Sequence, residues 1–339
     1  MQNFGDLEIL LQRCQDYVVT CHENPDGDAL GAANAMAMAL EKMEKNVTLL
    51  YPEEIPRKYY FLPRATNWHD LNKTEEAESY KCDVLIVLDA STQKRIEKVL
   101  DKVNFNTMLN IDHHPTNTLF GELNIVDEKA SSTCELLYDI FQRLELPLNK
   151  NIATNLYTGI FTDTGSFNFE NTTGKTFAAA KKLVEFNISP HIIAQEIYEN
   201  VPLNLFYFIR EILQNLNLSQ DKKIAWITCP RSIINKYQVN DSELEGVINY
   251  AKMLQPVEFA VLFRETEEGY TKVAFRSKTR DVSKVAVNLG GGGHVRAAGC
   301  FLKKDLRSAI DTVIYQLEQE LSPCGDHNND VNPTETANG

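Results

Sequence analysis

The amino-acid sequence predicts an α/β protein built from two domains. In the first half of the chain, short apolar runs typical of strands alternate with longer segments in which apolar residues recur at helical spacing. This alternation favours a mostly parallel sheet covered by helices. The length of 339 residues favours two domains over one, and an apolar fraction of 43% is enough to form a core in each.

The first domain, residues 1–190, is predicted to contain a mostly parallel sheet flanked by helices. Its clearest strand is the run Val-Leu-Ile-Val-Leu at residues 84–88, because a continuous apolar run of this length is typical of a strand buried on both faces. Three further runs predict strands at residues 17–21, 47–51 and 108–111. Helical spacing predicts helices at residues 29–42, 131–144 (with Ser131 or Ser132 as N-cap), 151–161 and 172–186.

A smaller α/β domain is predicted at residues 222–321. Residues 192–216 are expected to be helical, and we interpret residues 191–221 as a helical linker between the domains. Strands are predicted at residues 224–229, 257–264 and 271–277, and helices at 246–253 and 282–289. The tail, residues 322–339, is predicted to be disordered because its composition cannot build a core.

Composition excludes several classes of protein. No apolar run approaches the roughly 18 residues that span a bilayer, so we expect no membrane partner. The first residues are acidic rather than basic, which argues against a signal peptide and for a cytoplasmic location. Seven cysteines without a Cys-x-x-Cys pair argue against a disulfide framework or a zinc ribbon.

The distribution of charge points to a local site for anions. The net charge of -13 is unusual for a nucleic-acid-binding protein. However, residues 270–304 contain eight lysines and arginines and a single acid, Asp281. Such a basic patch can bind phosphate within an acidic protein.

Acids and histidines gather in four turns of the first domain. Each turn alone is compatible with ordinary solvated acids or helix caps. Three of the turns, however, follow predicted strands that would lie about 5 Å apart, and so many acids would repel one another without a cation. We therefore predict two divalent metal ions, as in sites that hydrolyse phosphoesters. The candidates are His22, Asp26, Asp28, Asp89, Asp112, His113, His114 and, in the fourth turn, Asp163.

A glycine-rich segment of the second domain is the candidate phosphate site. Four consecutive glycines let backbone N–H groups approach an anion, and a following helix would add its N-terminal dipole. The alternative is a flexible linker. The sequence fits neither a Walker loop nor a dinucleotide-binding fingerprint. The candidate residues are Gly290, Gly291, Gly292, Gly293, His294 and Arg296, together with Arg276 and Ser277 at the end of a predicted strand.

These motifs resemble the DHH phosphoesterase superfamily, in the subfamily whose second domain is called DHHA1. The resemblance spans about residues 5–320 and rests on four ordered motifs plus the glycine segment: His22 to Asp28, Asp89, Asp112-His113-His114, Thr162 to Gly165, and Gly290 to His294. Within the superfamily the chain is most similar to the short bifunctional oligoribonuclease and pAp phosphatase enzymes, or nano-RNases. The first domain would be the catalytic DHH domain, with a mostly parallel five-stranded sheet, and the second would be the substrate-binding DHHA1 domain.

The resemblance implies a role for each motif residue. One ion would be held by His22, Asp26 and Asp89, and a second by Asp28, Asp89, His113 and Asp163, so that Asp89 bridges them. His114 would contact the scissile phosphate, and Asp112 would support it or act as a weak base, so that His114, Asp112 and Asp89 are the expected catalytic residues. Arg276, Ser277, the glycines and His294 would hold the nucleotide. Mn2+ is the expected metal, with Mg2+ and Co2+ as alternatives.

Two motifs depart from the family pattern. The residues after Asp89 read Ala-Ser-Thr where relatives often have Thr-Ser-Asp, which removes no expected ligand. The glycine segment continues as Gly-His-Val-Arg rather than Gly-His-Arg-Asn, so Arg296 is expected to do part of the work of a displaced arginine.

The expected activity is hydrolysis of short oligoribonucleotides, of two to five residues, to mononucleotides, and removal of phosphate from pAp. Three alternatives stay open at this point: a phosphodiesterase for linear dinucleotides such as pApA or pGpG, a pyrophosphatase or exopolyphosphatase, and a nucleotide-binding module without catalysis. Short RNA and pAp are the expected ligands, and a homodimer is an open alternative to a monomer.

Overall fold

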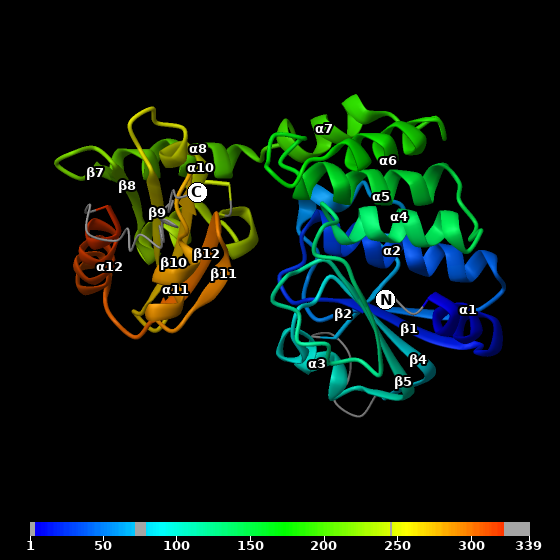
Figure 1. Ribbon diagram of the computed structural model, residues 1–339. Helices are drawn as coiled ribbons and strands as arrows, with labels where there is room; N and C mark the ends of the chain where they lie inside the picture. The colour runs from blue at the N-terminus through cyan, green and yellow to red at the C-terminus, as the bar shows by residue number, and fades with distance from the viewer. Residues whose placement is uncertain (1–3, 72–78, 245, 322–339) are drawn as a thin grey trace, which may run out of the picture. The chain divides into compact units, whose positions relative to one another are not determined.

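The structure is a computed structural model that describes residues 4–71, 79–244 and 246–321. Residues up to Asn200 form one compact unit, and residues from Val201 onward form a second unit (Figure 1). The tail predicted at residues 322–339 lies outside the described residues.

A parallel sheet forms the centre of the first unit, in the strand order β3-β2-β1-β4-β5-β6. The pairs from β2 to β6 are all parallel, which confirms the predicted five-stranded parallel sheet, and the two-residue strand β3 adds to its edge. The strands are β1 (Asp16–Cys21), β2 (Asn46–Tyr51), β3 (His69–Asp70), β4 (Tyr80–Leu88), β5 (Val103–Asp112) and β6 (Leu123–Val126).

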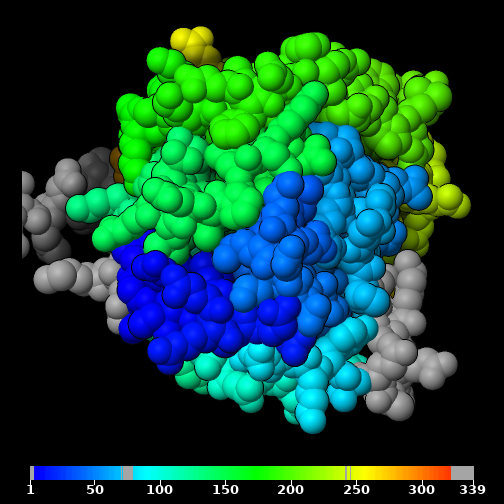
Figure 2. Space-filling view, turned by 90° about the vertical axis from the view of Figure 1, so that its right-hand side faces the viewer, coloured from blue at the N-terminus to red at the C-terminus, as the bar shows by residue number. Residues whose placement is uncertain are grey.

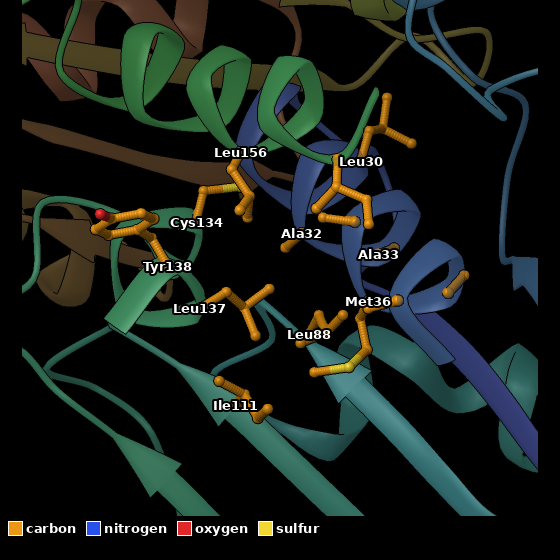
Figure 3. Close-up of a cluster of buried hydrophobic side chains, with 14 of the residues drawn as sticks. Leu30, Ala32, Ala33, Met36, Leu88, Ile111, Cys134, Leu137, Tyr138 and Leu156 are labelled. Carbon is orange, nitrogen blue, oxygen red and sulfur yellow. The ribbon is translucent and has the colours of Figure 1, made fainter. Parts of the chain in front are cut away.

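Strand β4 shows why the sheet is buried on both sides. Val84, Ile86 and Leu88 point into the larger hydrophobic cluster, whereas Leu85 and Val87 point into a second cluster on the opposite face. Successive side chains of a strand alternate between faces, so an unbroken apolar run requires cover on both. Figure 3 shows Leu88 and Ile111 of the sheet facing residues of three helices across the larger cluster.

Helices cover both faces of this sheet. α2, α4 and α5 lie together on one face (Figures 1 and 3), and α3 packs into the second cluster through Val99. Small residues allow α2 and α5 to approach closely, because a Cβ at Gly31 would lie 2.5 Å from the Asn155 carbonyl oxygen. The helices are α1 (Phe4–Arg13), α2 (Gly27–Lys42), α3 (Glu97–Leu100), α4 (Thr133–Arg143), α5 (Lys150–Asp163), α6 (Gly174–Val184) and α7 (Pro190–Tyr198), with 3-10 turns η1 (Arg57–Tyr59) and η2 (Gln93–Ile96).

The helical segment expected at residues 192–216 is interrupted, so its prediction as one helix was wrong. α7 ends at Tyr198, and α8 (Leu203–Ile212) begins directly after Pro202. A proline disfavours helical conformation in the preceding residue, which explains the break. Ile193 of α7 packs into the core of the first unit, and Phe208 of α8 packs into a core of the second. Residues 191–221, expected as a linker, are thus divided between the two units.

The second unit contains a mixed sheet in the order β11-β12-β10-β9-β8-β7. Only the β8–β9 pair is parallel among its described strands. The strands are β7 (Leu216–Leu218), β8 (Ile224–Cys229), β9 (Phe259–Glu265), β10 (Thr271–Ser277), β11 (Gly292–His294) and β12 (Ala297–Leu302). The helical elements after α8 are η3 (Leu213–Asn215), α9 (Arg231–Tyr237), η4 (Asp241–Leu244), α10 (Ile248–Lys252), α11 (Ser283–Asn288) and α12 (Leu306–Leu321).

The faces of this second sheet belong to different cores. α11 and α12 pack with Val261, Val273 and Phe275 on one face, whereas Ala260 and Leu262 face the core formed with α8 and α10. The α/β class and the two-domain architecture are therefore as predicted.

No helix in the described part of the chain is long and apolar enough to cross a membrane. The surface of the first unit shown in Figure 2 includes α1, in dark blue, and segments of the green helices. The six cysteines in the described part of the chain are free thiols.

Candidate functional site

The ends of three neighbouring strands place the candidate site at one edge of the first sheet. Cys21 at the end of β1 is paired with Leu88 of β4, and Leu88 is paired with Ile111 of β5. The chain continues from these positions into His22, Asp89 and Asp112. Open parallel sheets place their sites at this carboxyl edge, and the buried strands hold the side chains that follow them in fixed positions.

Asp89 lies at the centre of the cluster. Its carboxylate is 3.4 Å from His22 Nε2, 3.7 Å from His113 Nε2 and 3.6 Å from His114 Nδ1. The side chain is 2% exposed, and its backbone has a left-handed conformation with φ of 58°. A left-handed φ is costly for a residue other than glycine and recurs at functional sites.

His113 faces three carboxylates through the same nitrogen. Besides Asp89, its Nε2 lies 3.5 Å from Asp163 Oδ2 and 4.0 Å from Asp28 Oδ2. Its other nitrogen, Nδ1, lies 3.3 Å from the Ala130 carbonyl oxygen. A hydrogen bond from Nδ1 to this carbonyl leaves Nε2 to face the carboxylates, which is the usual arrangement of a metal-binding histidine.

His22 is oriented in a similar way. Its Nδ1 lies 2.6 Å from the carbonyl oxygen of Glu23, so that Nε2 faces Asp89. Arg95 donates to the same Glu23 carbonyl at 3.3 Å, and its own carbonyl accepts from the Glu23 N–H. Arg95 therefore fixes the turn that carries His22.

The N-termini of two helices hold the remaining acids. Asp26 is the N-cap of α2, where one carboxylate oxygen accepts from the N–H groups of Asp28 and Ala29. Asp28 accepts from the N–H groups of Thr133 and Cys134, 2.6 and 2.9 Å away, at the start of α4. A helix N-terminus presents unpaired N–H groups and favours negative charge.

The ligand atoms of these residues lie close enough together to hold metal ions. Three groups have ligand atoms within 4.8 Å of one another among the described residues: His22 with Asp26 and Asp89; Asp28 with His113 and Asp163; and Asp89 with His113 and His114. The structure thus brings together all six residues that the resemblance assigns to metal. Asp163 ends α5, which extends two residues beyond the predicted helix.

His114 and Asp112 form a hydrogen-bonded pair beside this cluster. The buried Asp112 accepts from His114 Nδ1 at 2.7 Å and from the His113 N–H at 2.9 Å. Its second oxygen accepts from Asn117 Nδ2 at 2.6 Å. Asp112 therefore orients His114 and lies in none of the three ligand groups.

The electrostatics of the cluster favour a bound cation. Burial raises the pKa of Asp28 to about 7, and the charge of Asp89 adds to the effect. Burial and the charge of Asp28 raise the pKa of Asp163 well above its usual value. Burial also opposes ionisation of Asp89, but the hydrogen bond with His22 and the charge of His114 outweigh it and lower that pKa. Carboxylates under such mutual repulsion match the donor set of a divalent metal site.

The predicted nucleotide-binding residues lie on the second unit, and the structure brings only some of them together. Arg276 of β10 and His294 of β11 share a face of the sheet, since each is paired with Ala297 of β12. Ser277 points to the opposite face, is buried, and donates to the Arg280 carbonyl. Arg296 lies in the turn between β11 and β12.

The glycine segment is part of a β-hairpin, so the expected helix after it was wrong. Gly292 begins β11, which pairs with β12. The N–H groups of Gly290 and Gly291 donate to carbonyls of α11, at 2.9 and 2.7 Å, and end that helix. Sequence alone does not distinguish a glycine run that cradles an anion from one that lets two backbones pack closely.

Three residues of the site were missed from the sequence. Thr133 donates from Oγ1 to Asp89 Oδ1 at 2.9 Å, in addition to its N–H contact with Asp28. Arg95 and Asn117 hold the turns of His22 and Asp112. A threonine at a helix start and an arginine after a strand are common, so no motif marks them.

Comparison with known proteins places both domains in described families. The model of the DHH family N-terminal domain matches residues 16–160, and the model of the DHHA1 domain matches residues 223–322. The bifunctional oligoribonuclease and PAP phosphatase NrnA of Thermus thermophilus is 30% identical over 312 residues, covering 91% of this chain and 91% of that protein. The protein of the same name from Bacillus subtilis is 30% identical over 283 residues, covering 82% and 86%.

A solved structure shows the same fold. It is described as an exopolyphosphatase-related protein from Bacteroides fragilis and matches with a TM-score of 0.83 at 23% identity, covering 94% of this chain and 95% of that one. Together with the relatives that match most of its length, both domain models identify the chain. It belongs to the DHH family, in the group that joins a DHH domain to a DHHA1 domain.

Proposed function

We propose that the chain is a two-metal phosphoesterase that hydrolyses short oligoribonucleotides to mononucleotides and removes phosphate from pAp. The observation that carries the proposal is the central position of Asp89, which contributes to two of the three ligand groups. The names of the relatives from Thermus thermophilus and Bacillus subtilis support the choice of substrates.

The proposed metal ligands follow the groups that the structure brings together. His22, Asp26 and Asp89 would hold one ion, and Asp28, His113 and Asp163 would hold a second. Asp89, whose Oδ1 lies 3.7 Å from His113 Nε2, would contribute to the second ion as well. Imidazole with carboxylate suits Mn2+, with Mg2+ and Co2+ as alternatives. When bound, two such ions would supply a water of near-neutral pKa and would neutralise charge on the phosphoryl oxygens.

Side chains of the protein would bind the substrate, orient it and supply a proton to it. His114, held by Asp112 through Nδ1, presents its remaining ring nitrogen to a phosphoryl oxygen or to the leaving oxygen. Arg276, His294 and the backbone at Gly292 and Gly293 would hold the nucleotide on the second unit, with Arg296 adding charge. We expect a cytoplasmic protein, because such substrates arise there.

Purified full-length protein with Mn2+ tests the proposal on three substrates: a 5′-phosphorylated diribonucleotide, pAp and pyrophosphate. We expect the first two to be hydrolysed. Asp89→Ala and His113→Ala should each lower kcat by at least about 10²-fold. Each removes a proposed ligand of the metal ions that would neutralise charge on the reacting phosphate.

Matched variants control for loss of a carboxylate or an imidazole elsewhere. Asp101→Asn and His191→Ala change exposed residues outside the ligand groups, and we expect wild-type kcat from both. Full activity of Asp89→Ala would contradict the proposed site. Hydrolysis of pyrophosphate alone would contradict the proposed substrates.

A further inference from the structure

Residues 130–133, the segment that leads from β6 into α4, hold two of the ligands proposed for the second ion. The Ala130 carbonyl oxygen lies 3.3 Å from His113 Nδ1, and the Thr133 N–H donates to Asp28 Oδ2 at 2.6 Å. All four residues of the segment are buried. A metal ligand is oriented by the groups that its outer atoms contact, so the position of this segment sets the positions of His113 and Asp28.

The segment contacts Asp89, the ligand that both proposed ions share, on one oxygen. Thr133 Oγ1 donates to Asp89 Oδ1 at 2.9 Å, and the same oxygen lies 3.7 Å from His113 Nε2. His22, a proposed ligand of the first ion, faces the other oxygen, Asp89 Oδ2, at 3.4 Å. The contact from Thr133 therefore falls on the side of the carboxylate that faces the ligands of the second ion.

A buried carboxylate in the first turn of α4 anchors the segment. Glu135 is fully buried, and its Oε2 accepts from the Ser131 hydroxyl at 2.5 Å, from the Ser131 N–H at 3.4 Å and from the Thr176 hydroxyl at 2.7 Å. A glutamate three residues after an N-cap, here Ser132, commonly closes a capping box on the N–H of the cap. The carboxylate of Glu135 instead joins the segment to the first turn of α6.

Asn171 connects the third ligand of the second ion to the same segment. Its Nδ2 donates to the Ser131 carbonyl oxygen at 2.8 Å and to the Asp163 carbonyl oxygen at 3.1 Å. Asp163 is the last residue of α5, so this amide fixes the end of α5 against the segment that Glu135 anchors. Together the segment and Asn171 contact all three residues of this ligand group.

We propose that Glu135 is a positioning residue for the second ion alone. It is buried, belongs to none of the ligand groups, and acts through the segment. In the described part of the first unit, no hydrogen bond joins residues 130–133 to His22 or Asp26. Arg95 instead fixes the turn that carries His22. The inference rests on the proposed function and divides its two ions, because loss of this carboxylate would weaken one and leave the other unchanged.

Isothermal titration of metal-free, full-length protein with Mn2+ tests the two ions in separate backgrounds. In His22→Ala, which retains the ligand group of the second ion, adding Glu135→Met should lower the affinity about tenfold, since partners of a metal ligand contribute about 10- to 100-fold. In His113→Ala, which retains the ligand group of the first ion, adding Glu135→Met should leave the affinity unchanged. Glu135→Gln keeps an oxygen at this position and should restore most of the affinity.

Two further variants control for charge and for folding. Asp139→Asn is the matched control, because Asp139 lies one turn further along α4 and shares the ion-pair partner Lys175 with Glu135. It should change the affinity in neither background. Ser131→Ala removes one bond of the anchor with little change in volume. It should weaken the second ion alone, and it decides the question if Glu135→Met does not fold.

The results distinguish this inference from the proposed function. Equal losses in both backgrounds, or no loss in His22→Ala, would overturn the role of Glu135 while the two-metal site remained. A background that binds no Mn2+ would show that the ions bind only together, and would overturn the division between them. Wild-type protein that binds no Mn2+ would overturn the proposed function as well.

Discussion

Thr133 connects two carboxylates of the candidate metal site that lie far apart in the sequence. Its N–H donates to Asp28 and its hydroxyl to Asp89, and the residue is fully buried. Hydrogen bonds to ligand oxygens orient a metal ligand and tune its affinity. We therefore expect Thr133 to act as a positioning residue, although it belongs to none of the ligand groups.

Two substitutions of Thr133 distinguish the contribution of its hydroxyl group from that of its side-chain volume. Thr133→Val keeps the volume and the N–H contact with Asp28 but removes the bond to Asp89, so Mn2+ affinity should fall by about 10–100-fold. Thr133→Ser keeps the hydroxyl and should restore most of the affinity. Isothermal titration of metal-free protein with Mn2+ measures both. Wild-type affinity in Thr133→Val would show that the contact is not needed.

The residues of the cluster differ in how well the sequence predicts them. His22, Asp89 and Asp112 follow apolar runs directly, and parallel strands bring such positions to one edge, so their proximity could be inferred. Thr133 reaches Asp89 because α4 starts at that point in space, 44 residues further along the chain. Periodicity does not encode the position at which one helix meets a distant strand.

The element that the sequence predicts least well is the hairpin β11–β12. Its glycines suggested an anion-binding loop before a helix, but two of them pack the hairpin instead. A Cβ at Gly291 would overlap the Gly299 carbonyl and lie 2.5 Å from Cys300 Cβ, whereas a Cβ at Gly292 would project into open space. Within one run of glycines, therefore, position decides whether the residue serves packing or leaves room for a ligand.

Alanine substitutions at these neighbouring glycines test that division. Gly291→Ala places a Cβ against Gly299 and Cys300 of β12 and should lower the free energy of unfolding by about 1–3 kcal/mol, as overpacked sites do. Gly292→Ala should change it by less than about 0.5 kcal/mol. Urea unfolding can be followed for the second unit through Trp226 in a Trp68→Phe background. A similar loss in both variants would contradict the packing argument.

At the scale of the whole molecule, alternation of strands and helices was enough to predict the fold class and two domains. The division of residues 191–221 between the units was harder to predict, because apolar residues continue across Pro202 without a change in composition. The charge cluster, by contrast, affects the stability of the first unit as a whole. Asp28 and Asp163 are both held near other acids, so metal binding and folding are coupled.

The coupling predicts how pH controls stabilisation by metal. The folded state holds the Asp28 proton up to about pH 7, whereas an unfolded chain releases it near 3.8, so this contribution to metal-free stability is lost as pH rises through 7. Metal binding must displace that proton and those of His22 and His113, whose pKa values burial lowers and neighbouring acids raise more strongly. The increase in Tm on addition of Mn2+ should therefore be larger at pH 8 than at pH 6, measured by differential scanning fluorimetry. Asp28→Asn removes one of these protons and should reduce the difference between the two pH values. If the increase in Tm at pH 6 equalled or exceeded that at pH 8 in the wild type, the carboxylates of the metal-free protein would already be ionised at pH 6. The folded protein would then neutralise the cluster without a metal.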